Sequence, residues 1–155
     1  ESGKPRFMTN TNRMMGMHLV KKAEFGIITK AIKDVGAIKL KNVQSVSLAG
    51  EGILPMKSEL NFLFSYWQRI YSLLDFDLTG IRTANKLRKL YNIQPLFLTN
   101  GKFNTIDFNA KDPSEFIEVN GWNNYSTIVD TLLDESYGWI NTNDYYDFIS
   151  YYFKI

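Results

Sequence analysis

Short apolar runs alternate with amphipathic segments between residues 25 and 99, and this alternation restricts the fold more than any other feature. Apolar runs rich in β-branched residues are typical of buried strands, and apolar residues at a spacing of three or four are typical of helices. The order β-α-β-α-β-α-β predicts an α/β fold, with a central parallel sheet of about four strands covered by helices on both faces. The expected strands are residues 25–29, 45–48, 69–74 and 95–99, and the expected helices are residues 31–40, 60–67 and 78–91.

The two ends of the chain lie outside this alternation. Residues 14–20 are apolar enough for a short N-terminal strand or a packed turn. After a polar loop at residues 100–110, segments 113–119 and 125–133 predict two short helices. The aromatic segment 145–153 is expected to be helical and to pack on its own domain or on a neighbouring one. The chain opens without methionine, so we expect a piece of a longer protein.

The amino-acid composition restricts the catalytic and metal-binding chemistry open to this chain. The 155 residues suffice for one domain with a substantial core. Cysteine is absent, which excludes disulfides, thiolate zinc ligands and thiol nucleophiles, and a lone His18 leaves little room for histidine-based catalysis. Carboxylates, lysines, arginines and hydroxyls remain. No apolar run approaches the roughly 18 residues of a membrane span, so we expect no membrane contact, and the lack of cysteine is compatible with a cytoplasmic location.

The charges are unevenly distributed although the net charge is only +2. Residues 1–50 contain nine Lys and Arg against three Asp and Glu, and residues 51–105 contain seven against four. Residues 106–155 contain two against nine. A basic first two-thirds suits a polyanionic partner, although on charge alone an ordinary solvated surface is the better explanation.

An apolar run at residues 70–74 ends in two carboxylates, Asp75 and Asp77, and Gly80 follows. In an extended segment, residues i and i+2 point to the same side, and ligands of parallel sheets bind beyond the carboxyl ends of the strands. Two carboxylates aimed at one point suit a hard cation such as Mg²⁺. Asp77 also stands where the N-cap of the next helix belongs. On spacing alone, a cap and a metal ligand are equally good interpretations.

Further charged residues follow the first two expected strands. Lys30 and Asp34 come after the first strand, and Glu51 lies in a Gly-Glu-Gly loop after the second. Such a loop permits close approach of the backbone, but it is also a good turn. Lys30 and Lys33 lie in the first turn of a helix, where they oppose the helix dipole, which favours a functional reason for them.

The segment that begins at Lys111 has a local explanation. Asp112 is a good N-cap, Pro113 suits the first helical position, and Glu115 completes a capping box. The same segment can also bind phosphate or metal through Lys111 or Asp112.

Together these motifs resemble a TOPRIM domain, the α/β module of bacterial-type primases, topoisomerases and certain nucleases. Residues 74–81 are similar to its Asp-x-Asp motif and to the glycine that follows in primases. Residues 111–116 resemble the Lys-Asp-Pro segment of primases, and residues 27–35 resemble primases of bacteriophages and mobile elements. The resemblance, which covers residues 5–121, therefore favours a DnaG-like DNA primase of bacterial or phage type.

One position departs from the family pattern. A catalytic Glu normally ends the first strand, four residues before an Asp, and counting back from Asp34 leads to Lys30. Glu51 could supply the missing carboxylate, because neighbouring strand ends lie about 5 Å apart. Alternatively, Lys30 contacts phosphate directly. Both interpretations stay open.

The resemblance implies a TOPRIM domain at residues 25–121, a basic segment at residues 1–24 that packs on it, and an aromatic helical tail at residues 122–155. It implies Mg²⁺- or Mn²⁺-dependent RNA primer synthesis from NTPs on single-stranded DNA, and a replicative helicase as a partner of the parent protein. A TOPRIM nuclease, or an inactive nucleotide- or DNA-binding module, is the alternative.

The resemblance also implies roles for individual residues. Asp75, Asp77 and Glu51 would bind metal, and Lys30 and Asp34 would join them in catalysis. The residues expected to bind phosphate or nucleic acid are Lys30, Lys33, Arg82, Lys111, Arg6, Arg13, Lys21 and Lys22.

Overall fold

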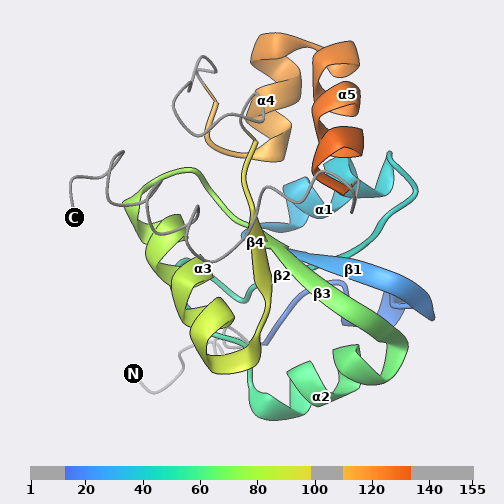
Figure 1. Cartoon of the computed structure of the whole chain (residues 1–155), viewed down its shortest axis with the longest axis vertical. Helices are drawn as coiled ribbons and strands as arrows, with labels where there is room; N and C mark the ends of the chain where they lie inside the picture. Colours follow the sequence, from blue (N-terminus) through green and yellow to red (C-terminus); the bar gives the residue numbers. More distant parts are fainter. Residues whose placement is uncertain (1–12, 99–109, 134–155) are drawn as a thin grey trace, which may run out of the picture.

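The structure is a computed structural model that describes residues 13–98 and 110–133. Four parallel strands form one sheet in the order β2-β1-β3-β4 (Figure 1). The strands are β1 (Ala23–Thr29), β2 (Gln44–Ser47), β3 (Trp67–Leu73) and β4 (Gln94–Leu96). The helices are α1 (Ile32–Lys39), α2 (Lys57–Tyr66), α3 (Leu78–Tyr91), α4 (Pro113–Asn120) and α5 (Trp122–Leu133), with a 3₁₀ turn, η2 (Met17–Leu19). The predicted α/β class and parallel sheet are confirmed.

Helices cover both faces of the sheet. Alternate strand residues face opposite sides, so Ile28 and Ile70 are buried in the core under α2 and α3, whereas Ile27 and Leu73 are buried in a second core under α1, α4 and α5. Figure 1 shows α4 and α5 beside α1 and away from α2. Tyr125 of α5 is fully buried in the second core, so the helix after residue 121 packs directly on the sheet domain.

The order of the strands determines where a ligand can bind. The chain leaves β1 through α1 to reach β2 on one side, and returns through α2 on the opposite face to reach β3 on the other side. This reversal is a topological switch point, and it opens a crevice at the carboxyl ends of the two central strands. Lys30 follows β1 directly, and Asp75 comes two residues after β3. These two positions therefore meet in the crevice.

The N-terminal segment forms a packed turn rather than a strand, the two alternatives that the sequence left open. In residues 13–20 the pairing is reduced to a single bridge, in which Met15 and Ser47 exchange two backbone hydrogen bonds of 3.0 Å. Gly16 follows with φ 85°, a left-handed conformation that ends the extension and leads into η2. The buried Glu59 carboxylate holds this segment, because it accepts the Met14 N–H at 2.7 Å and the Met56 N–H at 2.9 Å.

Helix and strand ends agree with the sequence predictions to within three residues where the structure describes them. Residues 78–91 form α3 as predicted, because both ends have local signals: Asp77 caps the start, and Asn92 ends the helix at φ 57°. Helix α2 starts at Lys57, earlier than expected. The predicted aromatic helix at residues 145–153 lies outside the described residues. Within the described parts, no helix is both long and apolar enough to cross a membrane.

Candidate functional site

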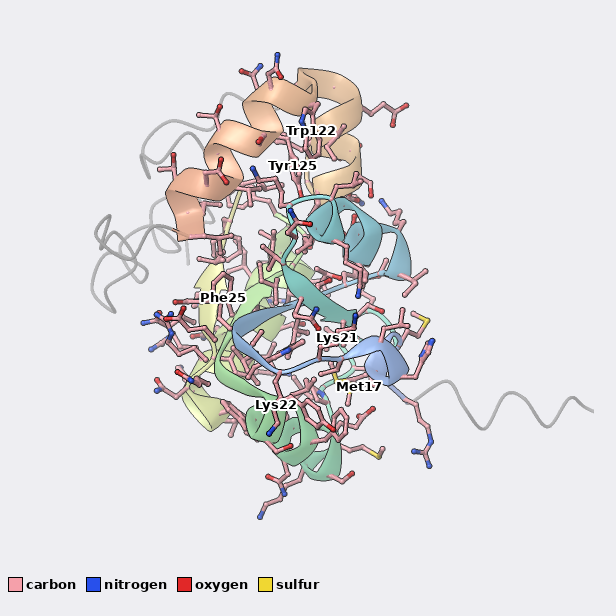
Figure 2. All side chains as sticks on the ribbon, turned by 90° about the vertical axis from the view of Figure 1, so that its right-hand side faces the viewer. Met17, Lys21, Lys22, Phe25, Trp122 and Tyr125 are labelled. Carbon is pink, nitrogen blue, oxygen red and sulfur yellow. The ribbon has the colours of Figure 1, made fainter. Side chains whose placement is uncertain are left out.

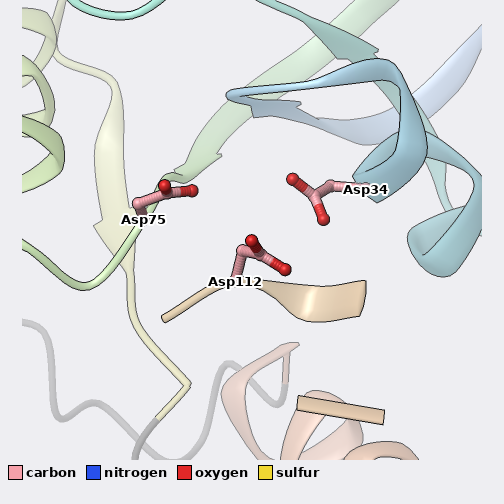
Figure 3. Close-up of side chains that lie close together, drawn as sticks. All are labelled: Asp34, Asp75 and Asp112. Atoms are coloured by element: carbon pink, nitrogen blue, oxygen red, sulfur yellow. The ribbon is translucent and has the colours of Figure 1, made fainter. Parts of the chain in front are cut away.

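Three aspartates meet at the carboxyl end of the sheet. Asp34 lies in the first turn of α1, Asp75 follows β3, and Asp112 precedes α4. One carboxylate oxygen from each lies within 4.8 Å of the others, and the three residues are 1%, 2% and 5% exposed. Figure 3 shows the three carboxylates pointing toward one another. We call these residues the acid cluster.

The backbone around Asp75 brings this residue to the cluster. Leu74 is buried in the core under α2 and α3, and Asp75 turns to the opposite side, toward α1. The first turn of α3 lies against it, and a Cβ at Gly80 would be only 2.0 Å from the Asp75 carbonyl oxygen. The Phe76 N–H donates to the Lys111 carbonyl at 2.7 Å. This bond ties the loop of Asp75 to the loop of Asp112.

Hydrogen bonds hold the other two aspartates. Asp34 Oδ1 accepts the Ser114 hydroxyl at 2.9 Å and the Ser114 N–H at 3.2 Å, so α1 is linked to the first turn of α4. Asp112 Oδ1 accepts the Glu115 N–H at 2.8 Å, and Glu115 Oε2 accepts the Lys111 N–H at 2.8 Å. The predicted N-cap at Asp112 is present, and the same residue belongs to the cluster.

Two lysines neutralise part of this charge. Lys30 Nζ lies 2.9 Å from Asp75 Oδ2, and Lys33 Nζ lies 2.7 Å from Asp112 Oδ2 and 3.9 Å from Asp34 Oδ1. Three carboxylates against two ammonium groups leave one negative charge in excess when all are ionised.

Burial and the neighbouring charges together shift the pKa values of the carboxyls. Burial, and then the charge of Asp112, raise the pKa of Asp34. Burial also raises the pKa of Asp75, and the Lys30 hydrogen bond offsets only part of this effect. Burial also raises the pKa of Asp112. The hydrogen bonds from Lys33 and Glu115 outweigh this effect, so the pKa of Asp112 lies below its usual range. Asp34 and Asp75 are therefore the carboxyls that lack sufficient positive charge.

A small hollow adjoins the cluster and shares Lys30 and Asp75 with it. Its polar lining includes Lys30, Glu51, Asp75, Asp77 and Thr79. Glu51 is exposed and Asp77 is half-buried. Asp77 Oδ1 accepts the Gly80 N–H at 2.8 Å, so the predicted helix cap is present. Neither Asp77 nor Glu51 belongs to the acid cluster, and their roles as metal ligands stay predictions.

The cationic residues predicted from the sequence lie in different places. Arg82 is exposed on α3, and Lys111 is exposed next to Asp112. Arg13 precedes the bridge between Met15 and Ser47. Because this segment runs antiparallel to β2, Arg13 lies toward the carboxyl end of the sheet.

Lys21 and Lys22 precede β1 and so lie at the amino end of the sheet, opposite the carboxyl end that carries the acid cluster. Figure 2 shows Lys22 and Trp122 toward opposite ends of the molecule. From Lys22 to Lys30 is about 26 Å at 3.3 Å per residue. Arg6 lies outside the described residues.

Sequence reasoning did not place Ser114 in the site, and it assigned Asp112 mainly to capping. Both residues come after the fourth strand in the chain, and they lie at the same end of the sheet as the other strand ends. That position is the signal that could have identified them.

The acid cluster fits a hard divalent cation. Mg²⁺ and similar ions prefer carboxylate oxygens at 2.0–2.1 Å, so two opposite ligands lie about 4.2 Å apart, close to the spread of the cluster. Asp34 Oδ2 and Asp75 Oδ1 accept no hydrogen bond from any residue in ranges 13–98 and 110–133. These two oxygens are therefore the ones available to a cation.

No family model and no curated protein sequence matches this chain. Its structure is similar to solved primases. The primase fragment of the bacteriophage T7 primase-helicase protein matches with a TM-score of 0.54 at 15% identity, over 79% of this chain and 49% of that one. The DnaG primase catalytic domain bound to ssDNA matches with a TM-score of 0.53 at 14% identity, over 82% of this chain and 42% of that one.

The Aquifex aeolicus primase, with its zinc-binding and RNA polymerase domains, matches with a TM-score of 0.55 at 16% identity, over 99% of this chain and 41% of that one. This chain thus spans about half or less of the length of these proteins. It has the fold of DnaG-type primase catalytic domains, and the TOPRIM resemblance of the motifs is confirmed at the level of the fold.

Proposed function

We propose that this chain is the TOPRIM domain of a DNA primase-like protein and that it joins ribonucleotides on a single-stranded DNA template. The observation that carries the proposal is the acid cluster: three buried aspartates converge at the switch point of a fold shared with primase catalytic domains. Buried carboxylates are costly without a cationic partner, and the two lysines leave a negative excess.

In this proposal Asp34, Asp75 and Asp112 hold Mg²⁺ or Mn²⁺, and Asp77 and Glu51 act as further or water-mediated ligands at the rim. When bound, the cation supplies charge that neutralises the triphosphate and the in-line transition state of nucleotidyl transfer. The 3′-hydroxyl of the growing primer attacks the α-phosphorus, a new P–O bond forms, and pyrophosphate leaves.

The chain's own cations serve the phosphates. Lys30 and Lys33 lie at the cluster itself, and Lys111 lies exposed next to Asp112. Arg82, exposed on α3, is a further candidate for a phosphate contact. Arg13 approaches from the edge of β2 and is suited to the template strand.

A second candidate is a nucleotide- or DNA-binding module without turnover. The Lys30–Asp75 ion pair favours it, because a lysine here replaces the carboxylate that the family pattern uses in catalysis. The TOPRIM nuclease is disfavoured for the same reason.

The test is an incubation with single-stranded template, NTPs and Mg²⁺. We expect short RNA products that vanish in Asp75→Asn, whereas Glu118→Gln, an exposed acid on α4, leaves them unchanged. Template cleavage instead of RNA synthesis would identify the nuclease. Binding of nucleotide and template without either product would identify the module.

A further inference from the structure

Lys30 contacts the acid cluster and also lines the hollow beside it. It follows β1 directly, and β1 neighbours β3 in the sheet, so its side chain reaches Asp75 across the switch point. Its ammonium lies 2.9 Å from Asp75 Oδ2. The same side chain lines the hollow together with Glu51 and Asp77. Lys30 can therefore face either side.

The two lysines of the site are held differently. Lys33 contacts two aspartates, at 2.7 Å and 3.9 Å. Lys30 forms one ion pair among the described residues, with Asp75, and its side chain is 30% exposed. A lysine held by one contact at the mouth of a hollow can change partner at low cost, because its ammonium is a point charge on a flexible four-carbon stem.

Lys30 competes with any divalent cation that Asp75 binds. Both charges are positive and both require the same carboxylate, which is nearly fully buried. At such short range in a poorly solvated site, like charges repel strongly. A cation on Asp75 therefore weakens the contact with Lys30, and Lys30 weakens the binding of the cation.

We propose that Lys30 is an exchangeable counter-ion: it neutralises Asp75 when the site holds no metal, and it moves to a nucleotide phosphate when a divalent cation binds. This inference rests on the proposed function in its choice of metal and nucleotide as ligands. The hollow is the space into which the ammonium turns, and Thr79 and Gly80 at the start of α3 form its far wall.

The exchange couples the two ligands. A triphosphate stabilises the displaced ammonium, so the nucleotide helps the cation to bind, and by linkage the cation helps the nucleotide to the same degree. A neutral residue at position 30 removes the competitor and the phosphate contact together. The two affinities should then move in opposite directions.

The experiment measures Mn²⁺ binding to the chain alone, and ATP binding at saturating Mg²⁺, for the unmodified chain and for Lys30→Gln, Lys30→Arg and Lys86→Gln. Lys86 is exposed on α3 and outside the site, so it is the matched control. In Lys30→Gln we expect Mn²⁺ to bind about 10-fold tighter and Mg-ATP about 10-fold weaker, since a partly buried charge contact is worth about one factor of ten or more. Lys30→Arg should keep Mn²⁺ affinity near that of the unmodified chain, and Lys86→Gln should change neither.

Several results would overturn the inference. Mn²⁺ binding that is unchanged or weaker in Lys30→Gln would show that Lys30 only supports the structure, and so would unchanged ATP binding. Lys30→Met, which keeps the apolar stem, repeats the comparison if Lys30→Gln melts at a lower temperature. Primer synthesis is scored separately. Opposite shifts in the two affinities without any primer would uphold the exchange and reject the proposed catalysis.

Discussion

Gly80 lies against the backbone of Asp75, and a methyl group at residue 80 would be 2.0 Å from the Asp75 carbonyl oxygen. The contact joins the start of α3 to the loop that carries a cluster aspartate. We expect Gly80→Ala to push this loop away, with a loss of about 1–3 kcal/mol in the free energy of unfolding, as for other overpacked sites. Mn²⁺ binding should weaken as well.

Gly36→Ala is the control for this change, because a Cβ there meets no atom within 4 Å. Urea unfolding and Mn²⁺ titration check both effects. Unchanged stability of Gly80→Ala would mean that the loop adjusts freely, and the contact would then not determine the position of Asp75.

Asp34 carries a charge that the metal-free chain accommodates poorly. Burial and the neighbouring Asp112 raise its pKa, so its protonated form is favoured in the folded state. The contribution of this carboxyl to stability is therefore greatest at acid pH and is lost as the pH rises through the folded pKa. In EDTA at pH 7.5, Asp34→Asn should be more stable than the unmodified chain by on the order of 1 kcal/mol.

The advantage of Asp34→Asn should shrink as the pH is lowered, because the unmodified Asp34 then becomes neutral too. Chemical unfolding at several pH values measures this, with Glu118→Gln as the control. A variant less stable than the unmodified chain at pH 7.5 would show that the Ser114 hydrogen bonds outweigh the burial of charge.

Ser114 holds Asp34 through its hydroxyl at 2.9 Å. Ser114→Ala removes this donor but keeps the backbone donor. We expect a loss of about 1–3 kcal/mol, the usual range for a hydrogen bond to a charged group. Mn²⁺ binding should weaken because the Asp34 carboxylate can rotate away from the cluster. Ser58→Ala, on the exposed surface of α2, is the matched control. Equal Mn²⁺ affinity in both variants would remove Asp34 from the ligand set.

Tyr125 offers a test of the second core, under α1, α4 and α5. Its buried hydroxyl donates to the Ala37 carbonyl at 2.9 Å, and burial raises its pKa well above the usual value of about 10. Tyr125 must therefore stay protonated in the folded chain, whereas it ionises above about pH 10 in the unfolded chain. Its contribution to stability is complete below pH 10 and is lost as the pH rises further.

At pH 8, Tyr125→Phe should be less stable than the unmodified chain by about 1 kcal/mol. Above pH 10 this difference should shrink by up to about 1.4 kcal/mol per pH unit. Lysines titrate in the same pH range, but their effect on stability is the same in both proteins and cancels in the difference. A difference that stays constant up to pH 11 would show that Tyr125 ionises equally well in the folded state.

The path of the template can be traced by salt dependence. Arg82 is exposed on α3, five residues after the cap residue Asp77, and Lys22 precedes β1 at the amino end of the sheet. Each lost phosphate contact lowers the slope of log affinity against log salt by about 1. We expect this change in Arg82→Gln, measured with a single-stranded DNA. If Lys22→Gln changes the slope and Arg82→Gln does not, the strand runs along the amino end of the sheet.

The helices and strands could be predicted because their signals are local. The apolar spacing, the Asp77 cap and the Pro113 start depend on neighbours within a few residues, and all of them recur in the structure. For the N-terminal segment, the local signals left a strand and a packed turn open. Its geometry depends on the buried Glu59 carboxylate, which lies 45 residues away from Met14 in the sequence.

The sequence by itself determined the parallel α/β sheet, the motifs at its strand ends and the importance of Asp75, because periodicity and motif spacing are properties of contiguous residues. Only the tertiary structure decided which carboxylates join Asp75. Asp34 and Asp112 are 78 residues apart in the chain, and the Phe76–Lys111 hydrogen bond and the Ser114–Asp34 contact bring them together. The strand order likewise decided that Lys30 pairs with Asp75, because that pairing requires β1 and β3 to be neighbours.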